Sequence, residues 1–175
     1  MRALLLRSGV VILVLGLAWI AVCVRFVVHP DIDEPEPVDV VYVLGGDDHH
    51  GWEAGLELID QGYADELLIS LPFGRPPECD TPPEGVQVTC FDPDPSTTRG
   101  EAQNFLDFAE ENDWDSVIVV TWRSHLARSR MLMERCFDGE ILMVEDHLPM
   151  TRWKWVEEFF YQSGAWVKTQ ILRGC

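Results

Sequence analysis

The segment VDVVYVLGG, residues 38–46, constrains the fold of this chain more than any other. It is a nearly continuous run of apolar and β-branched residues that ends in two glycines. Such a run is typical of a strand buried on both faces of a parallel sheet, because a strand with one face in water alternates apolar and polar residues. The segment DSVIVVT, residues 115–121, repeats the pattern and predicts the central strand. Helices must therefore cover both faces of the sheet.

Predicted strands and helices alternate along the rest of the chain. Further strands are expected at 64–70, 85–90 and 140–145, and helices near 52–61, from 97 or 98 onward, at 126–136 and at 151–172. Thr97 or Thr98 can cap the second of these helices, since Glu101 follows three or four residues later. This order predicts an α/β fold: a three-layer, doubly wound, Rossmann-like domain at 38–175 with a mostly parallel sheet of about five strands.

The first 29 residues predict a transmembrane helix that precedes the domain. No residue from Gly9 to Val24 is charged, and with 26–28 the apolar run reaches about 20 residues, the length that a bilayer core requires. Arg25 lies near one end, where its long side chain can reach the interface. Arg2 and Arg7 precede the run, and an acidic stretch follows it. The positive-inside rule predicts a single-pass plasma-membrane protein with a cytoplasmic N-terminus and an extracytoplasmic domain.

A cleaved signal peptide is the competing interpretation, because the chain opens with a basic region and an apolar region. No small-x-small cleavage site stands out, and the sequence Ile-Ala-Val-Cys at 20–23 lacks the small residue that a lipoprotein site needs before its cysteine. We therefore favour an uncleaved anchor, and in both cases the domain is exported. Residues 30–37 are acidic and rich in proline, which predicts a short, stiff, solvated linker.

The charge of the chain restricts its partners. All 30 Asp and Glu lie at or beyond Asp31, whereas only ten of the 13 Lys and Arg do, so the part after residue 30 carries about −20. This charge repels phosphate backbones and acidic lipid surfaces, and we expect no nucleic-acid partner. Against this background the segment TWRSHLARSR, residues 121–130, gathers three arginines and a histidine. Positive charge gathered in one short segment of so acidic a chain indicates a local role for that segment.

Four cysteines lie in the exported part: Cys79, Cys90, Cys136 and Cys175. An even number outside the cytoplasm indicates two disulfides. We favour Cys79 with Cys90, which closes a proline-rich loop, and Cys136 with Cys175, which ties the chain end to the body. The alternative is four free, buried thiols. No metal site is predicted, because the cysteines and histidines lack ligand spacing.

Ligands of doubly wound sheets bind at the carboxyl ends of the strands. Three loops follow strands there: LGGDDHHG, DPDPSTTRGE and TWRSHLARSR. In the last loop, Thr121 would end its strand and Ser124 could cap the next helix. His125 and Arg128 then lie three residues apart on one face near the positive end of the helix dipole. This arrangement predicts a binding site for a phosphate or carboxylate, with His125 as the candidate general acid or base.

Other interpretations of these residues stay open. Arg123 and Arg130 fall elsewhere around the helical turn, and we expect them to be solvated and paired with acidic side chains. His125 and Arg128 can instead form a buried ion pair with Asp or Glu. The loop residues Asp47, Asp48, His49 and His50 could bind a metal or serve acid-base chemistry, although adjacent side chains seldom converge and a solvated loop is preferred.

The motifs in this order resemble the SanA/YdcF/ElyC-like family over most of residues 38 to about 170. VVYVLGG is similar to that family's first strand and glycine turn, and VVTWRSHLARS to its V-T-S-x-x-H-x-x-R-A signature, with matches at Val120, Thr121, His125 and Arg128. STTRGEA resembles its T-x-E-N-A segment, with Thr98 and Ala102 in register. The predicted ligand-binding residues are Gly45, Gly46, Asp47, Thr98, Glu101, Thr121, His125 and Arg128.

The chain also departs from this family's pattern. Gly100 and Glu101 stand where the family commonly has Glu and Asn, and DDHHGWEAG replaces a segment that usually brings an arginine. The resemblance implies a role in the bacterial cell envelope, where a phosphate-bearing intermediate suits both the basic pocket and the anchor. One relative binds S-adenosylmethionine, but such molecules are scarce outside the cytoplasm, so the cofactor stays unknown.

Three functions remain possible. The first is an envelope enzyme, a transferase or hydrolase, that acts on a small anionic intermediate through His125 and Arg128. The second is a non-catalytic binder or regulator that uses the same pocket. The third is a structural protein that works through the aromatic helix at 151–172. We favour core packing for the aromatic residues of this helix, and part of the helix could instead face the membrane or a partner. No G-x-S-x-G motif occurs, which removes the commonest α/β-hydrolase mechanism. The sequence does not predict an oligomeric state.

Overall fold

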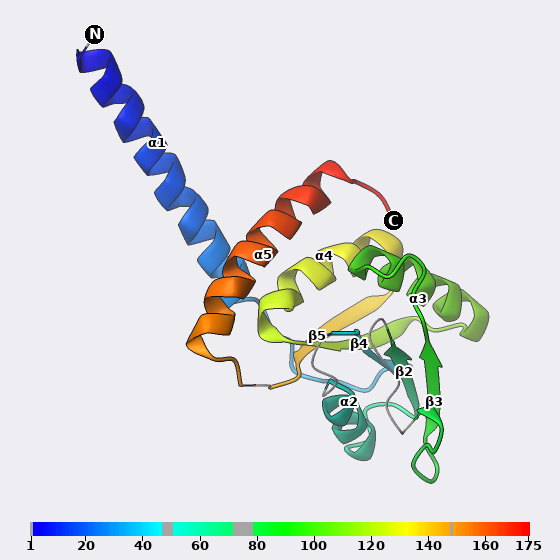
Figure 1. Ribbon diagram of the computed structural model, residues 1–175. Helices are drawn as coiled ribbons and strands as arrows, with labels where there is room; N and C mark the ends of the chain where they lie inside the picture. Colours follow the sequence, from blue (N-terminus) through cyan, green and yellow to red (C-terminus); the bar gives the residue numbers. More distant parts are fainter. Residues whose placement is uncertain (1, 47–50, 72–78, 148) are drawn as a thin grey trace.

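Five parallel strands form the centre of the structure, a computed structural model that describes all residues except 1, 47–50, 72–78 and 148 (Figure 1). The strands are β1 (Val40–Val43), β2 (Glu66–Ser70), β3 (Gln87–Phe91), β4 (Ser116–Thr121) and β5 (Glu140–Glu145). Their order in the sheet is β3-β2-β1-β4-β5. Every neighbouring pair is parallel, which confirms the predicted α/β fold and its five-stranded sheet.

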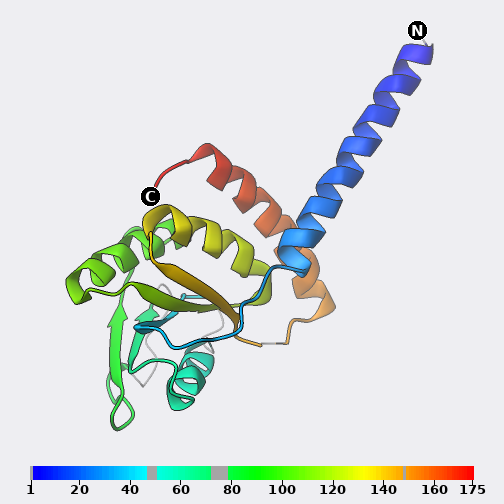
Figure 2. The same ribbon diagram turned by 180° about the vertical axis from the view of Figure 1, so that it is seen from behind.

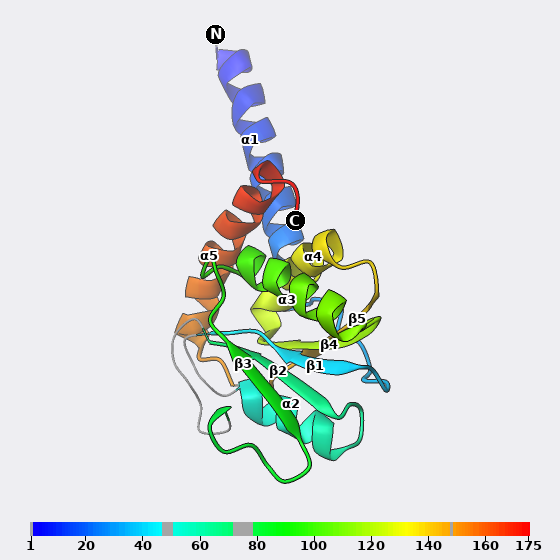
Figure 3. The same ribbon diagram turned by 90° about the vertical axis from the view of Figure 1, so that its right-hand side faces the viewer.

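Helices cover both faces of the sheet (Figure 3). In β1, Val40 and Tyr42 face one core, which α3 (Thr98–Asn112) and α4 (Leu126–Cys136) cover. Val41 and Val43 face the other core, which α2 (Gly51–Asp60) covers. All four residues are at most 3% exposed, and the one polar group among their side chains, the Tyr42 hydroxyl, donates to the Glu101 carbonyl at 3.1 Å. The continuous apolar run in the sequence follows directly from this double burial.

The N-terminal segment forms α1 (Arg2–Cys23), followed by a π-helical stretch, η1 (Val24–Val28). Residues Arg7–Val28 are long and apolar enough to cross a membrane, with a mean hydropathy of 2.7. A membrane anchor and a signal sequence share these properties. At its base, α1 packs on the last helix, α5 (Arg152–Ile171): Phe26 stacks on Trp166 with ring centroids 5.2 Å apart. Figure 2 shows that the rest of α1 extends away from the domain.

The acidic linker is less free than the sequence predicted. It has no regular structure, but Asp33 binds Met143 of β5 twice: its backbone N–H donates to the Met143 carbonyl at 3.0 Å, and its carboxylate accepts from the Met143 N–H at 2.7 Å. The same carboxylate forms an ion pair with Arg130. The linker therefore lies along the outer strand, whose edge groups would otherwise be unpaired.

Both predicted disulfides are present. Cys79 is joined to Cys90, and Cys136, the last residue of α4, is joined to Cys175 at the chain end. Cys23 in α1 is free and buried. The apolar N-terminal helix and the disulfides together indicate an extracytoplasmic or membrane location.

Candidate functional site

The carboxyl end of β4 and the beginnings of α3 and α4 bring four predicted site residues together. They are Thr98, Thr121, His125 and Arg128. Thr121 is the last residue of β4, and His125 follows it in a 3-10 turn, η3 (Arg123–His125). Thr98 is the first residue of α3, and Arg128 lies in the first turn of α4. Residues almost 30 positions apart in the chain therefore meet at one edge of the sheet.

His125 is fully buried and bound at both ring nitrogens. Its Nδ1 lies 3.0 Å from the Thr121 hydroxyl, and its Nε2 lies 3.2 Å from the Thr98 hydroxyl. Burial and the positive charge of Arg128 hold the pKa of His125 well below its ordinary value. The imidazole is therefore neutral near pH 7, and two hydroxyls that can each donate or accept satisfy it. Trp122 stacks on the ring, with centroids 4.4 Å apart.

Arg128 binds only neutral groups directly. Its Nε donates to Oε1 of Gln162 at 2.8 Å, and an η nitrogen donates to the Thr98 hydroxyl at 3.2 Å. Among the described residues, no carboxylate lies within ion-pair distance of it. Burial lowers the pKa of Arg128, and the surrounding Tyr161, Glu101 and Glu158 raise it. An arginine remains charged after such a shift, so the site holds a positive charge that no described carboxylate contacts directly.

The glycine turn after β1 meets α3 through Glu101. The Gly45 N–H donates to the Glu101 carboxylate at 2.8 Å, and Glu101 is only 3% exposed. Burial raises the pKa of this carboxyl, although the Gly45 hydrogen bond and Arg128 offset part of the effect. Gly46 lies against Trp122, whose ring would be 2.7 Å from a Cβ at that position. Asp47, like Asp48, His49 and His50, lies outside the described residues.

Sequence reasoning missed two residues of the site, Glu158 and Gln162 on α5. Glu158 is 7% exposed, and its Oε2 accepts from the Ser124 hydroxyl at 2.8 Å, from the Trp122 indole at 3.3 Å and from the Gln162 amide at 3.0 Å. A carboxylate of the chain itself thus lies beside the turn for which the sequence predicted an anion. The four-residue spacing of two polar side chains in an aromatic helix was the available signal.

The role predicted for Ser124 is wrong. Its side chain makes no capping hydrogen bond at the start of α4, because its hydroxyl donates to Glu158 instead. Arg123 and Arg130 pair with acidic side chains, as predicted: Arg123 binds Glu145 through two hydrogen bonds, and Arg130 binds Asp33. Both pairs are more buried than expected, since Arg123 is half-buried and Glu145 is buried.

An apolar crevice between α1, α4 and α5 reaches the site. Its cavity volume is about 20 Å³, and it opens to the surface. Its walls are Trp19, Val22, Cys23, Phe26, Val27, Ser124, Ala127, Arg128, Gln162, Ser163 and Trp166. Arg128 is the one charged side chain among these walls. The crevice therefore combines a mainly apolar lining with a single positive group.

Fold and site together define a parallel α/β domain with a polar cluster at the carboxyl edge of its sheet. No protein-family model matches the chain, and no curated protein matches it either. The resemblance noted in the sequence therefore stays a prediction. In the described part of the chain, no group of three His, Cys, Asp or Glu side chains could hold a metal ion.

Proposed function

We propose that this protein is anchored in the plasma membrane by α1 and that its extracytoplasmic domain binds a small anionic molecule of the cell envelope at Arg128. The observation that carries the proposal is the guanidinium of Arg128, which has neutral hydrogen-bond partners and lines an open crevice. An anionic ligand would supply a direct counterion, which Arg128 does not have among the described residues, through charge-assisted hydrogen bonds. The same features agree with a phosphate- or carboxylate-bearing metabolite of the kind that the family resemblance implies.

The surroundings of His125 favour binding over catalysis. A general acid or base must be within hydrogen-bond reach of the reacting group, either directly or through one water. Here both ring nitrogens contact threonine hydroxyls, and Trp122 covers one face of the ring. An enzymatic role for His125, as a transferase or hydrolase of an envelope intermediate, would require Thr98 or Thr121 to exchange its hydrogen bond for one to the substrate.

The test uses the full chain in detergent micelles, with inorganic phosphate and hexyl phosphate as probes in isothermal titration calorimetry. Hexyl phosphate joins an anion, which can bind Arg128, to an apolar chain, which can contact the apolar walls of the crevice. We expect saturable binding of at least one probe and a loss of at least tenfold in affinity in Arg128→Gln. Arg130→Gln is the matched control, because Arg130 lies two residues later but pairs with Asp33 on another side of α4.

The proposal fails if neither probe binds, or if Arg128→Gln binds as tightly as the wild type while both proteins have the same circular dichroism spectrum. Prolonged incubation of hexyl phosphate with the protein distinguishes the two versions of the function. Release of inorganic phosphate that His125→Ala abolishes would establish catalysis. Saturable binding without turnover of this probe is the outcome that we expect.

A further inference from the structure

The amphipathic character of α5 is the reverse of that in an ordinary surface helix. Its buried side chains are polar: Glu158, Gln162 and Thr169. Several of its exposed side chains are large and apolar, with Trp153 79%, Phe160 71% and Ile171 75% exposed. A surface helix of a soluble domain places its apolar stripe on the core and its polar residues in water. The polar side of α5 covers the candidate site, so its apolar side is left facing outward.

The exposed apolar residues form one continuous stripe along α5. Trp153, Val156, Phe160, Val167 and Ile171 are spaced by three, four, seven and four residues, and all are at least 45% exposed. At 3.6 residues per turn they fall within an arc of about 60°. We call this set the apolar stripe. Large contiguous apolar patches on a protein surface mark contact with a partner or a membrane.

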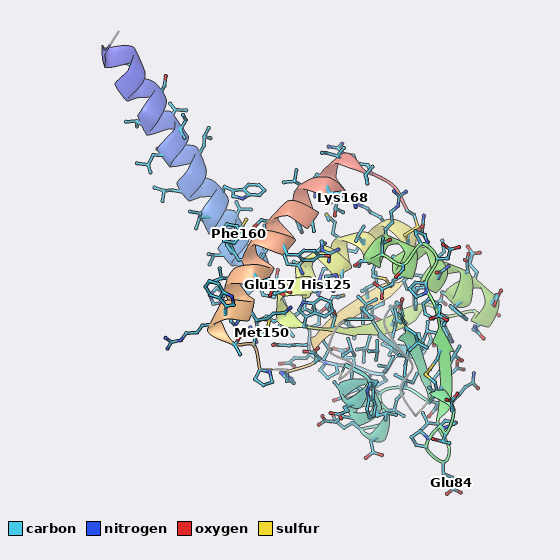
Figure 4. The ribbon with its side chains drawn as sticks, in the orientation of Figure 1. Glu84, His125, Met150, Glu157, Phe160 and Lys168 are labelled. Atoms are coloured by element: carbon cyan, nitrogen blue, oxygen red, sulfur yellow. A yellow bond between two sulfur atoms is a disulfide. The ribbon has the colours of Figure 1, made fainter. Side chains whose placement is uncertain are left out.

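The position of α5 beside α1 indicates which of these it contacts. The Ser163 hydroxyl lies 3.1 Å from Cys23 Sγ at the base of α1, and Trp166 stacks on Phe26. By helical geometry, Ser163 lies within about 20° of the edge of the apolar stripe. The exposed apolar surface of α1 therefore continues onto α5. Figures 1 and 2 show α5 on the side of the domain from which α1 extends, and Figure 4 shows Phe160 on α5 and His125 in the domain below.

The charge of this segment differs from that of the rest of the domain. Residues 151–175 carry four Lys and Arg and two Glu, whereas residues 31–150 carry six Lys and Arg and 28 Asp and Glu. By helical geometry Lys154 and Lys168 lie on one side of the apolar stripe, where Glu157 also lies and pairs with Lys154, and Arg152 lies on the other side. Residues 151–175 are thus net positive, unlike the acidic linker at 30–37, and anionic lipid head groups attract such a positive segment.

We propose that the apolar stripe of α5 lies in the head-group region of the outer leaflet of the plasma membrane, beside the point where α1 leaves the bilayer. This inference rests on the part of the proposed function that keeps α1 in the membrane as an anchor. The aromatic side chains then sit at the depth that Trp and Tyr prefer, and the flanking lysines reach the phosphates. The domain is held by two adjacent elements, a spanning helix and a helix in the interface.

The test is photocrosslinking of the full chain in vesicles of phosphatidylethanolamine and phosphatidylglycerol. We would place p-benzoylphenylalanine at position 160 and, as a matched control, at position 84, which lies at the far tip of the domain (Figure 4). Mass spectrometry identifies the adducts. We expect phospholipid adducts at position 160 that are at least tenfold more abundant than at position 84.

Three results would overturn the inference. They are adducts at position 160 with a second copy of the chain in place of lipid, no adducts at position 160, or equal lipid adducts at both positions. A flotation assay with the same vesicles distinguishes loss of the α5 contact from loss of membrane anchoring by α1. Protein that floats with the vesicles without crosslinking to lipid at position 160 retains its anchor but lacks the α5 contact. Protein that does not float lacks the anchor itself, and the inference falls with it.

Discussion

The Ser124 hydroxyl donates a 2.8 Å hydrogen bond to the buried Glu158 carboxylate and so joins the turn after β4 to α5. The same oxygen accepts from Trp122 and Gln162, and Gln162 in turn accepts from Arg128. One carboxylate therefore holds α5 over the candidate site. Loss of the Glu158 carboxylate would leave the groups that donate to it without an acceptor in a site that excludes water, and this destabilises the fold.

Glu158→Ala should destabilise the domain by about 1–3 kcal/mol, because it leaves the Ser124 hydroxyl and the Trp122 indole without their acceptor. Urea unfolding in detergent micelles, followed by circular dichroism, measures the change. Glu157→Ala is the control: the exposed Glu157 lies 3.8 Å from Lys154, and such a pair contributes less than about 1 kcal/mol. Equal unfolding midpoints for the two variants would contradict the role given to Glu158.

Gly100→Ala should destabilise the domain by more than about 2 kcal/mol. A Cβ at this position would overlap the carbonyl oxygen of Pro95, and backbone cannot move aside as a flexible side chain does. Gly164→Ala, in the exposed part of α5, meets nothing within 4 Å and should stabilise by up to about 1 kcal/mol through helix propensity. Thermal unfolding of both variants tests the pair, and a shift of the same sign in both would refute the steric argument.

The contribution of the neutral His125 to the stability of the domain should fall as the pH falls below about 6.5. Its folded-state pKa is lowered, so the unfolded chain binds a proton that the folded domain excludes. The contribution of His125 to stability is fully present above the pKa that His125 has in the unfolded chain. It decreases as the pH falls toward the pKa of His125 in the folded domain. Between pH 7.5 and 5.5 the difference is about 1 kcal/mol.

Urea midpoints at these two pH values, compared between the wild type and His125→Gln, isolate this contribution. The glutamine side chain can donate and accept a hydrogen bond as a neutral imidazole does, but it does not titrate. The variant should therefore show a smaller loss of stability at pH 5.5 than the wild type. An identical pH dependence in both proteins would mean that His125 is not held neutral.

Replacing both Cys136 and Cys175 by serine should lower the free energy of unfolding by about 4 kcal/mol, compared with about 3 kcal/mol for Cys79 and Cys90. The first disulfide spans 39 residues and the second spans 11, and closing a longer loop removes more entropy from the unfolded chain. Denaturant unfolding of the two double variants provides the comparison. If removing the Cys79–Cys90 disulfide lowers the free energy of unfolding more than removing Cys136–Cys175 does, effects in the folded state outweigh the entropy of the unfolded chain.

Local patterns in the sequence were sufficient for the sheet and its order of elements. The unbroken apolar run at Val40–Val43 can be stable only with both faces covered, and the Thr97 cap marks the start of α3 by its hydrogen bond to Gly100. The disulfide pairing favoured from the positions of the cysteines was also confirmed. These features depend on neighbours within a few residues or on chain connectivity, so they can be predicted without coordinates.

Only the tertiary structure decided what surrounds Arg128 and His125. The sequence placed the two residues on one helical face, but Thr98 lies 27 residues before His125, and Gln162 lies 34 residues after Arg128. The partners of a buried polar group depend on which distant element packs over it, and no local periodicity records that choice. The outward-facing apolar side of α5 has the same origin. Its aromatic residues favoured core packing, but in the structure the polar side covers the site and several of the large apolar side chains are exposed.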